Sequence, residues 1–210
     1  MRRKFLPILL ALGLFLGPAS IPTSALGSKS LLVDSIQPLQ INSQTFCTAF
    51  AINKEQRLWA TAAHCAVVGE QVGGTMQIWD YPVVPVLIST DHDFAILQSV
   101  LVAGEPIEVA SRPAEVGDRI TIKGYPYGMF RLITTNGFMG ARLEPTYHGL
   151  LKKVILSDIG DITVARGNSG SPVLKGGKLI GVLWGRANES EHAVIVPWEV
   201  ISRAFAPYME

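Results

Sequence analysis

The sequence predicts an all-β protein that ends in one short helix. Short apolar runs with β-favouring residues recur at close intervals, and turn-forming residues separate them. This pattern is typical of a β-barrel or a β-sandwich. The 20 glycines and 13 prolines among 210 residues suit a chain with many turns. With 48% hydrophobic residues, the chain has ample apolar surface for the core of one or two domains.

The expected elements follow the order of the chain. Residues 31–41 begin like a strand and continue like a polar linker, and the next five strands are expected at 46–52, 58–62, 76–79, 83–89 and 94–99. Residues 105–118 carry two prolines and a glycine and predict the crossing between two halves. The second half is expected to hold strands at 119–123, 132–135, 153–157, 172–174, 179–184 and 193–196, with a helix from Pro197 to about Phe205.

Residues 1–25 have the pattern of a secretory signal peptide. Three basic residues come first, and the apolar run at 5–17 is shorter than a membrane span. The small residues Thr23 and Ala25 then precede a suitable cleavage site. An earlier cut near residue 19 and an uncleaved N-terminal anchor are the alternatives. We therefore expect a secreted or periplasmic protein with no stable membrane insertion after signal removal.

Charge and cysteine content exclude some function classes. A formal net charge of +1 gives no indication of a basic surface that binds a polyanion, so we expect no nucleic acid partner. An even cysteine count in an exported chain favours a disulfide between Cys47 and Cys65, with two buried free thiols as the alternative. The chain lacks the histidine and cysteine spacings of common metal sites. We expect neither a metal nor a cofactor.

Three separate stretches carry residues suited to nucleophilic catalysis. Ser169 lies between two glycines in 167–172, where a tight turn can aim backbone N–H groups into one small hollow. A serine needs a base to remove its proton, and His64 is the candidate base. Asp93 is the candidate carboxylate that orients the histidine, and Asp91 competes for that role.

These stretches together resemble a known family. Thr-Ala-Ala-His-Cys at 61–65 and Gly-Asn-Ser-Gly-Ser-Pro at 167–172 look like the two signatures of chymotrypsin-fold (trypsin-like) serine peptidases. The closer resemblance is to bacterial HtrA/Deg-type and glutamyl-endopeptidase-type enzymes, through the turn at 124–128 and through Asn168. The printed sequence ends after the expected peptidase domain, so we expect no PDZ domain.

The resemblance implies a fold and a division of the chain. It implies two six-stranded antiparallel β-barrels of the chymotrypsin type, followed by the short C-terminal helix. The N-terminal barrel would span 26–112 and carry the histidine and the aspartate. The C-terminal barrel would span 113–210 and carry the serine and the helix.

The resemblance also implies roles. Ser169 would attack the substrate carbonyl, His64 would transfer the proton, and Asp93 would orient the imidazole. The N–H groups of Gly167 and Ser169 would form the oxyanion hole. Phe-Ala-Ile-Leu at 94–97 follows Asp93 as in the family, which favours it over Asp91. A Cys47–Cys65 disulfide matches the family pattern.

The expected substrate-binding residues are Thr163, Leu183, Trp184 and Gly185. Leu183, Trp184 and Gly185 align with the family's segment that pairs with an extended peptide, although a core tryptophan is the alternative for Trp184. A pocket of Thr163 and Leu183 has no acidic residue, so we expect small or aliphatic residues before the cleaved bond (P1). Arg166 lies near the expected pocket mouth.

The sequence thus predicts an exported serine endopeptidase acting on a protein or peptide. The alternative is a catalytically silent trypsin-fold protein that binds peptides or partners. An α/β-hydrolase esterase is disfavoured because Ser171 replaces the second glycine of Gly-x-Ser-x-Gly and the acid precedes the nucleophile.

Overall fold

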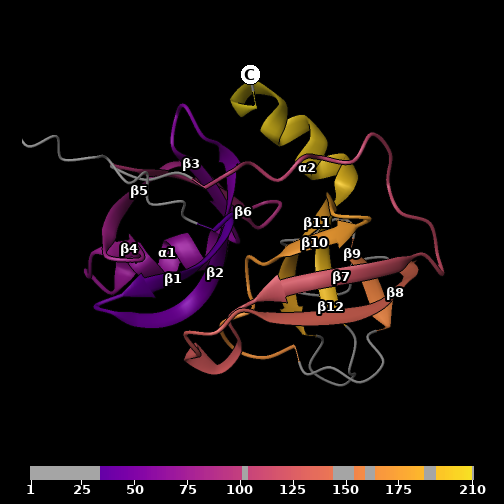
Figure 1. The fold of residues 1–210 in the computed structure, drawn as a ribbon, viewed down its shortest axis with the longest axis horizontal. Coiled ribbons are helices and arrows are strands. Elements are labelled where there is room, and N and C mark those ends of the chain that lie inside the picture. Colours follow the sequence, from indigo (N-terminus) through magenta and orange to yellow (C-terminus); the bar gives the residue numbers. More distant parts are fainter. Residues whose placement is uncertain (1–33, 101–103, 144–153, 159–163, 187–192, 210) are drawn as a thin grey trace, which may run out of the picture. The chain divides into compact units, whose positions relative to one another are not determined.

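The computed structural model describes residues 34–100, 104–143, 154–158, 164–186 and 193–209, which form two closed six-stranded barrels (Figure 1). Every pairing between neighbouring strands is antiparallel. The predicted all-β class with two antiparallel barrels is confirmed. The first barrel has the strand order β1-β2-β3-β6-β5-β4 and consists of β1 (Ile36–Ile41), β2 (Gln44–Asn53), β3 (Leu58–Thr61), β4 (Met76–Ile78), β5 (Tyr81–Ser89) and β6 (Phe94–Ser99).

The second barrel closes in the same way. Its strand order is β10-β11-β12-β9-β8-β7, and β10 pairs with β7 to complete the ring. Its strands are β7 (Arg119–Gly124), β8 (Ile133–Leu143), β9 (Val154–Asp158), β10 (Pro172–Lys175), β11 (Lys178–Arg186) and β12 (Ala193–Pro197).

The first strand corrects one expectation. Residues 36–41 were expected to include a polar linker, but they form β1, and all six side chains are buried. The glutamines in this stretch suggested a solvent-exposed linker, but Gln37 is buried and its amide has hydrogen-bond partners. Its Nε2 donates to the Asp34 carbonyl at 3.0 Å, and its Oε1 accepts from the indole N–H of Trp79. A buried amide that is hydrogen-bonded is compatible with a barrel strand.

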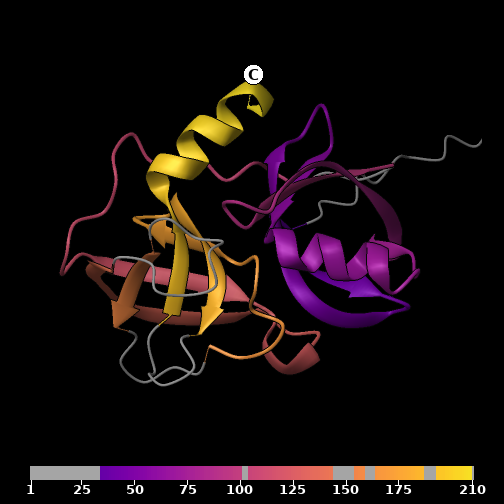
Figure 2. The same cartoon turned by 180° about the vertical axis from the view of Figure 1, so that it is seen from behind.

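Two α-helices accompany the barrels. The C-terminal helix α2 (Trp198–Phe205) was predicted, and it begins one residue after Pro197, which occupies the N-cap position. Helix α1 (Ala63–Gln71) was not predicted. It follows β3 directly and packs against β5 and β6 of the first barrel (Figure 2). Among the described residues, no helix is long and apolar enough to cross a membrane.

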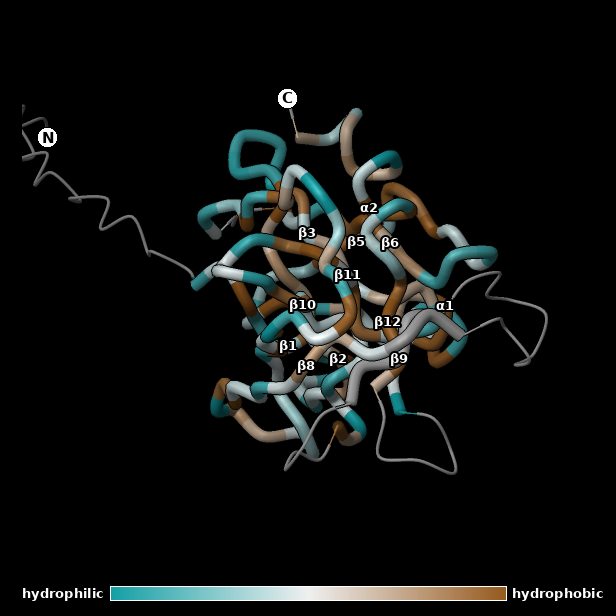
Figure 3. Tube along the Cα trace, turned by 90° about the vertical axis from the view of Figure 1, so that its right-hand side faces the viewer, coloured by the Kyte–Doolittle hydropathy of each residue, from teal (hydrophilic) through white to brown (hydrophobic). Residues whose placement is uncertain are grey.

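Three apolar clusters hold the fold together. One fills the first barrel around Leu39, Trp59 and Leu97, and another fills the second barrel around Ile120, Val173 and Leu183. Figure 3 shows that hydrophilic residues concentrate in the turns that join the strands.

The third cluster includes side chains from both barrels and from α2. Phe205 of α2 meets Phe50 and Phe94 of the first barrel, with ring centroids 6.4 and 5.6 Å apart. The helix that follows the last strand of the second barrel therefore returns to the first barrel and buries an aromatic ring there. Burying one such side chain contributes roughly 1.5–3 kcal/mol.

The segment between the barrels is bonded to both of them. Ile107 N–H donates to Ala51 O of β2 at 3.0 Å, and Ala110 N–H donates to Leu179 O of β11 at 2.9 Å. The predicted boundary between residues 112 and 113 falls in this stretch, between β6 and β7. The division into domains at that residue stays a prediction.

A disulfide joins Cys47 of β2 to Cys65 in the first turn of α1. The alternative of two free thiols is therefore wrong in this structure. The sequence separation is 18 residues, and closing a loop of that size stabilises the folded state by about 3 kcal/mol in the loop-entropy model.

Tyr125 connects the two barrels. It follows β7, yet its hydroxyl donates to Ile36 O of β1 at 3.1 Å, and its backbone N–H donates to Thr48 Oγ1 of β2 at 3.1 Å. Only 5% of the residue is exposed. Burial raises the pKa of Tyr125 to about 12, and the nearby Asp34 carboxylate adds to the effect.

We predict a loss of stability at high pH that depends on Tyr125. A raised pKa means that the folded state favours the neutral phenol, so this stabilisation is complete below the unfolded pKa of about 10. It disappears as the pH rises through the folded pKa of about 12. The free energy of unfolding, measured in urea at pH 9 to 12, should fall less steeply for Tyr125→Phe than for wild type. Identical slopes would contradict the assignment.

Candidate active site

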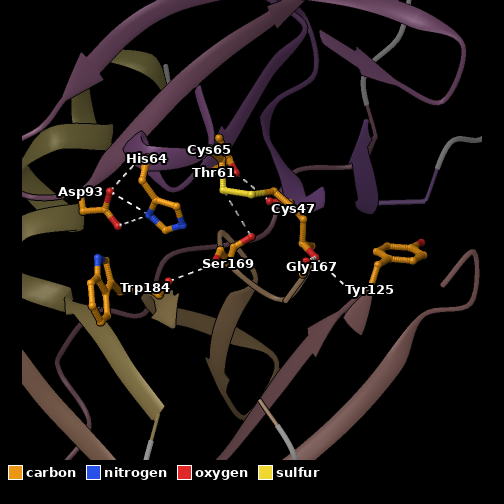
Figure 4. Close-up of a disulfide and its surroundings, with 10 residues drawn as sticks. Cys47, Thr61, His64, Cys65, Asp93, Tyr125, Gly167, Ser169 and Trp184 are labelled. Carbon is orange, nitrogen blue, oxygen red and sulfur yellow. Dashed lines mark hydrogen bonds and ion pairs between the residues drawn. A yellow bond between two sulfur atoms is a disulfide. The ribbon is translucent and has the colours of Figure 1, made fainter. Parts of the chain in front are cut away.

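His64 and Asp93 form a close pair in the first barrel (Figure 4). The Nδ1 atom of His64 lies 2.9 Å from Oδ2 and 3.1 Å from Oδ1 of Asp93. The Asp93 side chain is only 8% exposed, whereas that of His64 is 41% exposed. A buried carboxylate on one ring nitrogen holds the imidazole in one orientation. Nε2 is then the nitrogen that can accept a proton from a nucleophile.

Helix α1 explains how His64 is held. The His64 N–H belongs to the first turn of the helix, where backbone donors lack partners within the helix. Helix α1 has no side-chain cap of its own, and this N–H donates to Asp93 Oδ1 at 2.8 Å. The carboxylate thus caps α1 and fixes the imidazole at the same time. A negative charge at a helix N-terminus is also electrostatically favourable.

The structure distinguishes the two candidate aspartates. Asp91 is exposed, and Asp93 is the one beside His64. Asp93 ends the four-residue turn between β5 and β6 with a φ of +48°. Aspartate tolerates this left-handed conformation better than most residues.

The loop around Ser169 packs closely against Tyr125 and against strands β2 and β3. Gly167 has a φ of +98°, and a Cβ there would lie 2.2 Å from Tyr125 O. Gly170 has a φ of +83°, and a Cβ there would lie 2.2 Å from Thr61 Oγ1 and 2.3 Å from Thr48 O. Both positions therefore require glycine for conformation and for space.

Ser169 lies beside the pair, with its carbonyl oxygen 3.9 Å from Sγ of Cys65, the neighbour of His64, but its hydroxyl is bonded elsewhere (Figure 4). Its Oγ donates to Trp184 O at 3.0 Å, and in the described part of the chain no hydrogen bond joins it to His64. Catalytic hydrogen bonds are often long or absent without substrate. The structure therefore brings His64 and Asp93 together, with Ser169 beside them in another side-chain orientation.

Trp184 lies at a β-bulge. The register between β11 and β12 shifts between Leu183 and Gly185, so Trp184 has no partner on β12. Its indole packs edge-on to His64, with ring centroids 6.5 Å apart, while its carbonyl accepts from Ser169. Bulges commonly redirect a side chain beside an active site.

The other expected substrate residues lie in different surroundings. Leu183 is fully buried within the cluster of the second barrel, and Gly185 is partly exposed on the same strand. Thr163 lies outside the described residues. The pocket residues therefore stay a prediction.

The N–H groups expected to form the oxyanion hole have no protein partner in the described structure. Backbone hydrogen bonds there involve the N–H groups of Asn168 and Gly170, but not those of Gly167 and Ser169. Arg166 O accepts from Tyr127 N–H at 2.6 Å. The peptide is trans, so the Gly167 N–H points away from Tyr127.

Comparisons with known proteins identify the family. Residues 47–182 match the family described as trypsin-like peptidase domain. The chain belongs to this family. It is a serine endopeptidase with a trypsin-like fold. Among curated protein sequences, none matches the chain significantly.

Solved structures of peptidases resemble this trypsin-like peptidase in fold. The active form of the Rv3671c protease from M. tuberculosis is 21% identical, with a TM-score of 0.66 over 84% of this chain and 82% of that one. Deg5 is 23% identical, with a TM-score of 0.62 over 80% and 86%. Kallikrein-related peptidase 10 in a complex with Zn²⁺ is 15% identical, with a TM-score of 0.63 over 83% and 95%. Such low identities show a shared fold only.

One group of possible metal-ligating side chains occurs among the described residues of the peptidase. Ligand atoms of Cys47, His64 and Cys65 lie within 4.8 Å of one another. The two sulfur atoms form the disulfide, so neither is a thiolate that could bind a metal.

Sequence reasoning missed two residues that contact the loop around Ser169. Thr48 is fully buried, and its hydroxyl donates to Gly167 O at 2.8 Å. Tyr127 adopts a φ of +56° and bonds Arg166. A threonine in an apolar strand and a tyrosine between proline and glycine give no signal of these contacts.

We predict that Gly170→Ala destabilises the peptidase more than Gly177→Ala does. Both glycines have a φ of +83°, but the Cβ at Gly177 would meet nothing within 4 Å. The left-handed backbone costs both variants about 1–2 kcal/mol, and the clash at Gly170 costs about 1–3 kcal/mol more. Urea unfolding of both variants measures the difference. Equal losses would show that the loop can move away from Thr48 and Thr61.

Proposed function

We propose that the protein is an exported serine endopeptidase with Ser169 as nucleophile, His64 as general base and Asp93 as the orienting carboxylate. The observation that carries the proposal is the buried Asp93 carboxylate 2.9 Å from His64 Nδ1. A partly exposed histidine paired in this way, with a serine in a tight glycine turn beside it, has the chemistry of acyl transfer.

The reaction begins with a rotation of the Ser169 side chain. Its hydroxyl leaves Trp184 O and turns to Nε2 of His64. Oγ then attacks the scissile carbonyl carbon while its proton passes to Nε2. The Gly167 and Ser169 N–H groups donate hydrogen bonds to the carbonyl oxygen and stabilise the negative charge that forms on it. Losing one such donor costs roughly 3–4 kcal/mol of transition-state stabilisation.

Collapse of this intermediate breaks the peptide bond. The imidazolium of His64 gives its proton to the leaving amine, and an acyl-enzyme on Ser169 remains. A water molecule then loses a proton to His64 and attacks the ester. The second collapse returns the proton to Ser169 and releases the carboxylate product.

The substrate is proposed to bind as an extended strand beside the last residues of β11, because β10 pairs with β11 only as far as Val182. Leu183, Trp184 and Gly185 lie at the end of β11 nearest Ser169, and Trp184 already covers one edge of His64. Peptides commonly add to an exposed strand in this manner. Thr163 and Leu183 are proposed to determine a preference for small or aliphatic P1 residues.

We predict that Ser169→Ala abolishes labelling by a fluorophosphonate and lowers peptide hydrolysis by about 10⁴–10⁶-fold. Fluorophosphonates react with a serine only when a base activates it. His64→Ala should lose as much activity, and the double variant should be little worse because the residues act as a unit. Additive losses would contradict the triad. A folded wild-type chain that does not react would favour the silent binding protein, for which the Ser169–Trp184 bond is the supporting observation.

The two aspartates provide a matched control for this test. Asp93→Asn should lower kcat by about 10⁴-fold because the amide favours the wrong tautomer of His64. Asp91→Asn removes the same charge two residues away from an exposed position and should leave kcat unchanged. A similar loss in both variants would indicate a general charge effect.

We predict that a peptide library will show aliphatic residues at P1. Burying an aliphatic side chain gains roughly 1.5–3 kcal/mol, whereas burying an unpaired charge costs several kcal/mol. Arg166 is exposed on the loop around Ser169 and is proposed to favour acidic residues at neighbouring subsites. A dominant arginine, lysine or glutamate signal at P1 would refute the pocket assignment without affecting the triad.

A further inference from the structure

Thr48 makes four hydrogen bonds to three other segments, which are the loop around Ser169, the residue after β7 and the end of β3. Its backbone N–H donates to Ser169 O at 2.9 Å, and its carbonyl accepts from Thr61 Oγ1 at 2.7 Å. Its side-chain hydroxyl donates to Gly167 O at 2.8 Å and accepts from Tyr125 N–H at 3.1 Å. The residue is fully buried. Thr48 of the first barrel thus contacts two carbonyls of residues 167–170 in the second barrel, which we call the serine turn.

The hydroxyl serves two backbone groups of the second barrel. Tyr125 and Gly167 are far apart in sequence, and the Thr48 Oγ1 atom connects the N–H of one to the C=O of the other. Replacing the hydroxyl with a methyl group would leave both groups without this partner. Backbone groups buried without a partner are strongly disfavoured.

The bond to Gly167 O has a consequence for the adjoining N–H. The Gly167 N–H lies in the same peptide plane as Arg166 O. Because glycine has more rotational freedom than any other residue, that plane can turn relative to the next one, which carries Gly167 O. Tyr127 N–H holds the carbonyl on one side, at Arg166, and Thr48 holds the carbonyl on the other. With both carbonyls bonded, the N–H between them has one direction.

We propose that Thr48 is a positioning residue for the oxyanion hole: its hydroxyl fixes Gly167 so that the Gly167 N–H faces the developing oxyanion. The proposal rests on the proposed function of Ser169 and Gly167. Thr48 touches no reacting atom. Its effect should therefore appear in the transition state and be nearly absent from substrate binding.

The test compares Thr48→Val with Thr48→Ser. Valine keeps the shape and removes the hydroxyl, whereas serine keeps the hydroxyl. We expect Thr48→Val to lower kcat by about 10–100-fold, as a small misplacement of a catalytic group does, with KM within about twofold. A peptide aldehyde, whose hemiacetal places an oxygen in the oxyanion hole, should bind weaker by the same factor as kcat/KM. Thr48→Ser should retain kcat within about threefold.

Thr45 provides a control on the same strand. Its Oγ1 is buried and has no hydrogen-bond partner among the described residues. Thr45→Val makes the same chemical change in β2, and we expect wild-type kcat. Equal losses in Thr45→Val and Thr48→Val, a wild-type kcat in Thr48→Val, or an effect on KM alone would each overturn the proposal.

A measurement independent of activity separates this proposal from the proposed function. The Tyr125 amide should exchange slowly with deuterium in wild type and in Thr48→Ser, and faster in Thr48→Val. Rapid exchange at Tyr125 in the wild-type protein would overturn the proposal even if Thr48→Val failed to fold. If wild type does not react with a fluorophosphonate, the proposed function fails. Slow Tyr125 exchange would then show that the hydrogen bonds of the Thr48 hydroxyl are present but have only a structural role, and this outcome also overturns the positioning role.

Discussion

The positions of His64 and Ser169 relative to each other depend on the contact between β2 of the first barrel and the serine turn of the second. The proposed base and nucleophile belong to different barrels, so their separation is set by this joint. Thr48 N–H binds Ser169 O, and Gly170 fits against Thr48 O and Thr61 Oγ1 with no space for a Cβ. Thr61 ends β3, directly before the helix that carries His64. The serine turn is therefore placed against the residues that position the histidine.

The disulfide and Tyr125 strengthen this joint from two sides. Cys47, the neighbour of Thr48, is bonded to Cys65, the neighbour of His64. The covalent bond limits how far β2 can move relative to α1. Tyr125 reaches from the second barrel to Ile36 of β1 and lies in the cluster shared by both barrels. A change in packing between the barrels would thus move Gly167 and Ser169 together, because both are bonded to Thr48.

The barrel class and the candidate site residues could be predicted from the sequence because they depend on local patterns. Short strands and turn residues gave the barrel class, and His64, Asp93 and Ser169 stand in motifs with distinctive neighbours. Residues 31–41 were expected only to begin like a strand, because the buried glutamines of β1 look like a linker until their partners, such as Trp79, are known. Helix α1 was missed because its residues have no clear apolar periodicity and its cap, Asp93, lies 29 residues away.

The contacts of Thr48 and the bulge at Trp184 were beyond sequence reasoning for a different reason. They depend on the register between strands and on how the two barrels meet, and neither leaves a local pattern. A one-residue shift in β11 changes which side chain faces His64. The bulge makes this residue Trp184, whose carbonyl then becomes an acceptor for the serine.

Residues with a positive φ also differ in whether local sequence or tertiary contacts explain their conformation. Asn42 and Ser43 have positive φ in the two-residue loop that joins β1 to β2, where a hairpin turn requires it. Tyr127 has a positive φ next to a proline and a glycine, in a turn where its N–H reaches Arg166 O. A non-glycine residue holds such a conformation only where its surroundings fix it. At Tyr127 the surroundings include the loop that carries Ser169, so this strained conformation orients the peptide before Gly167.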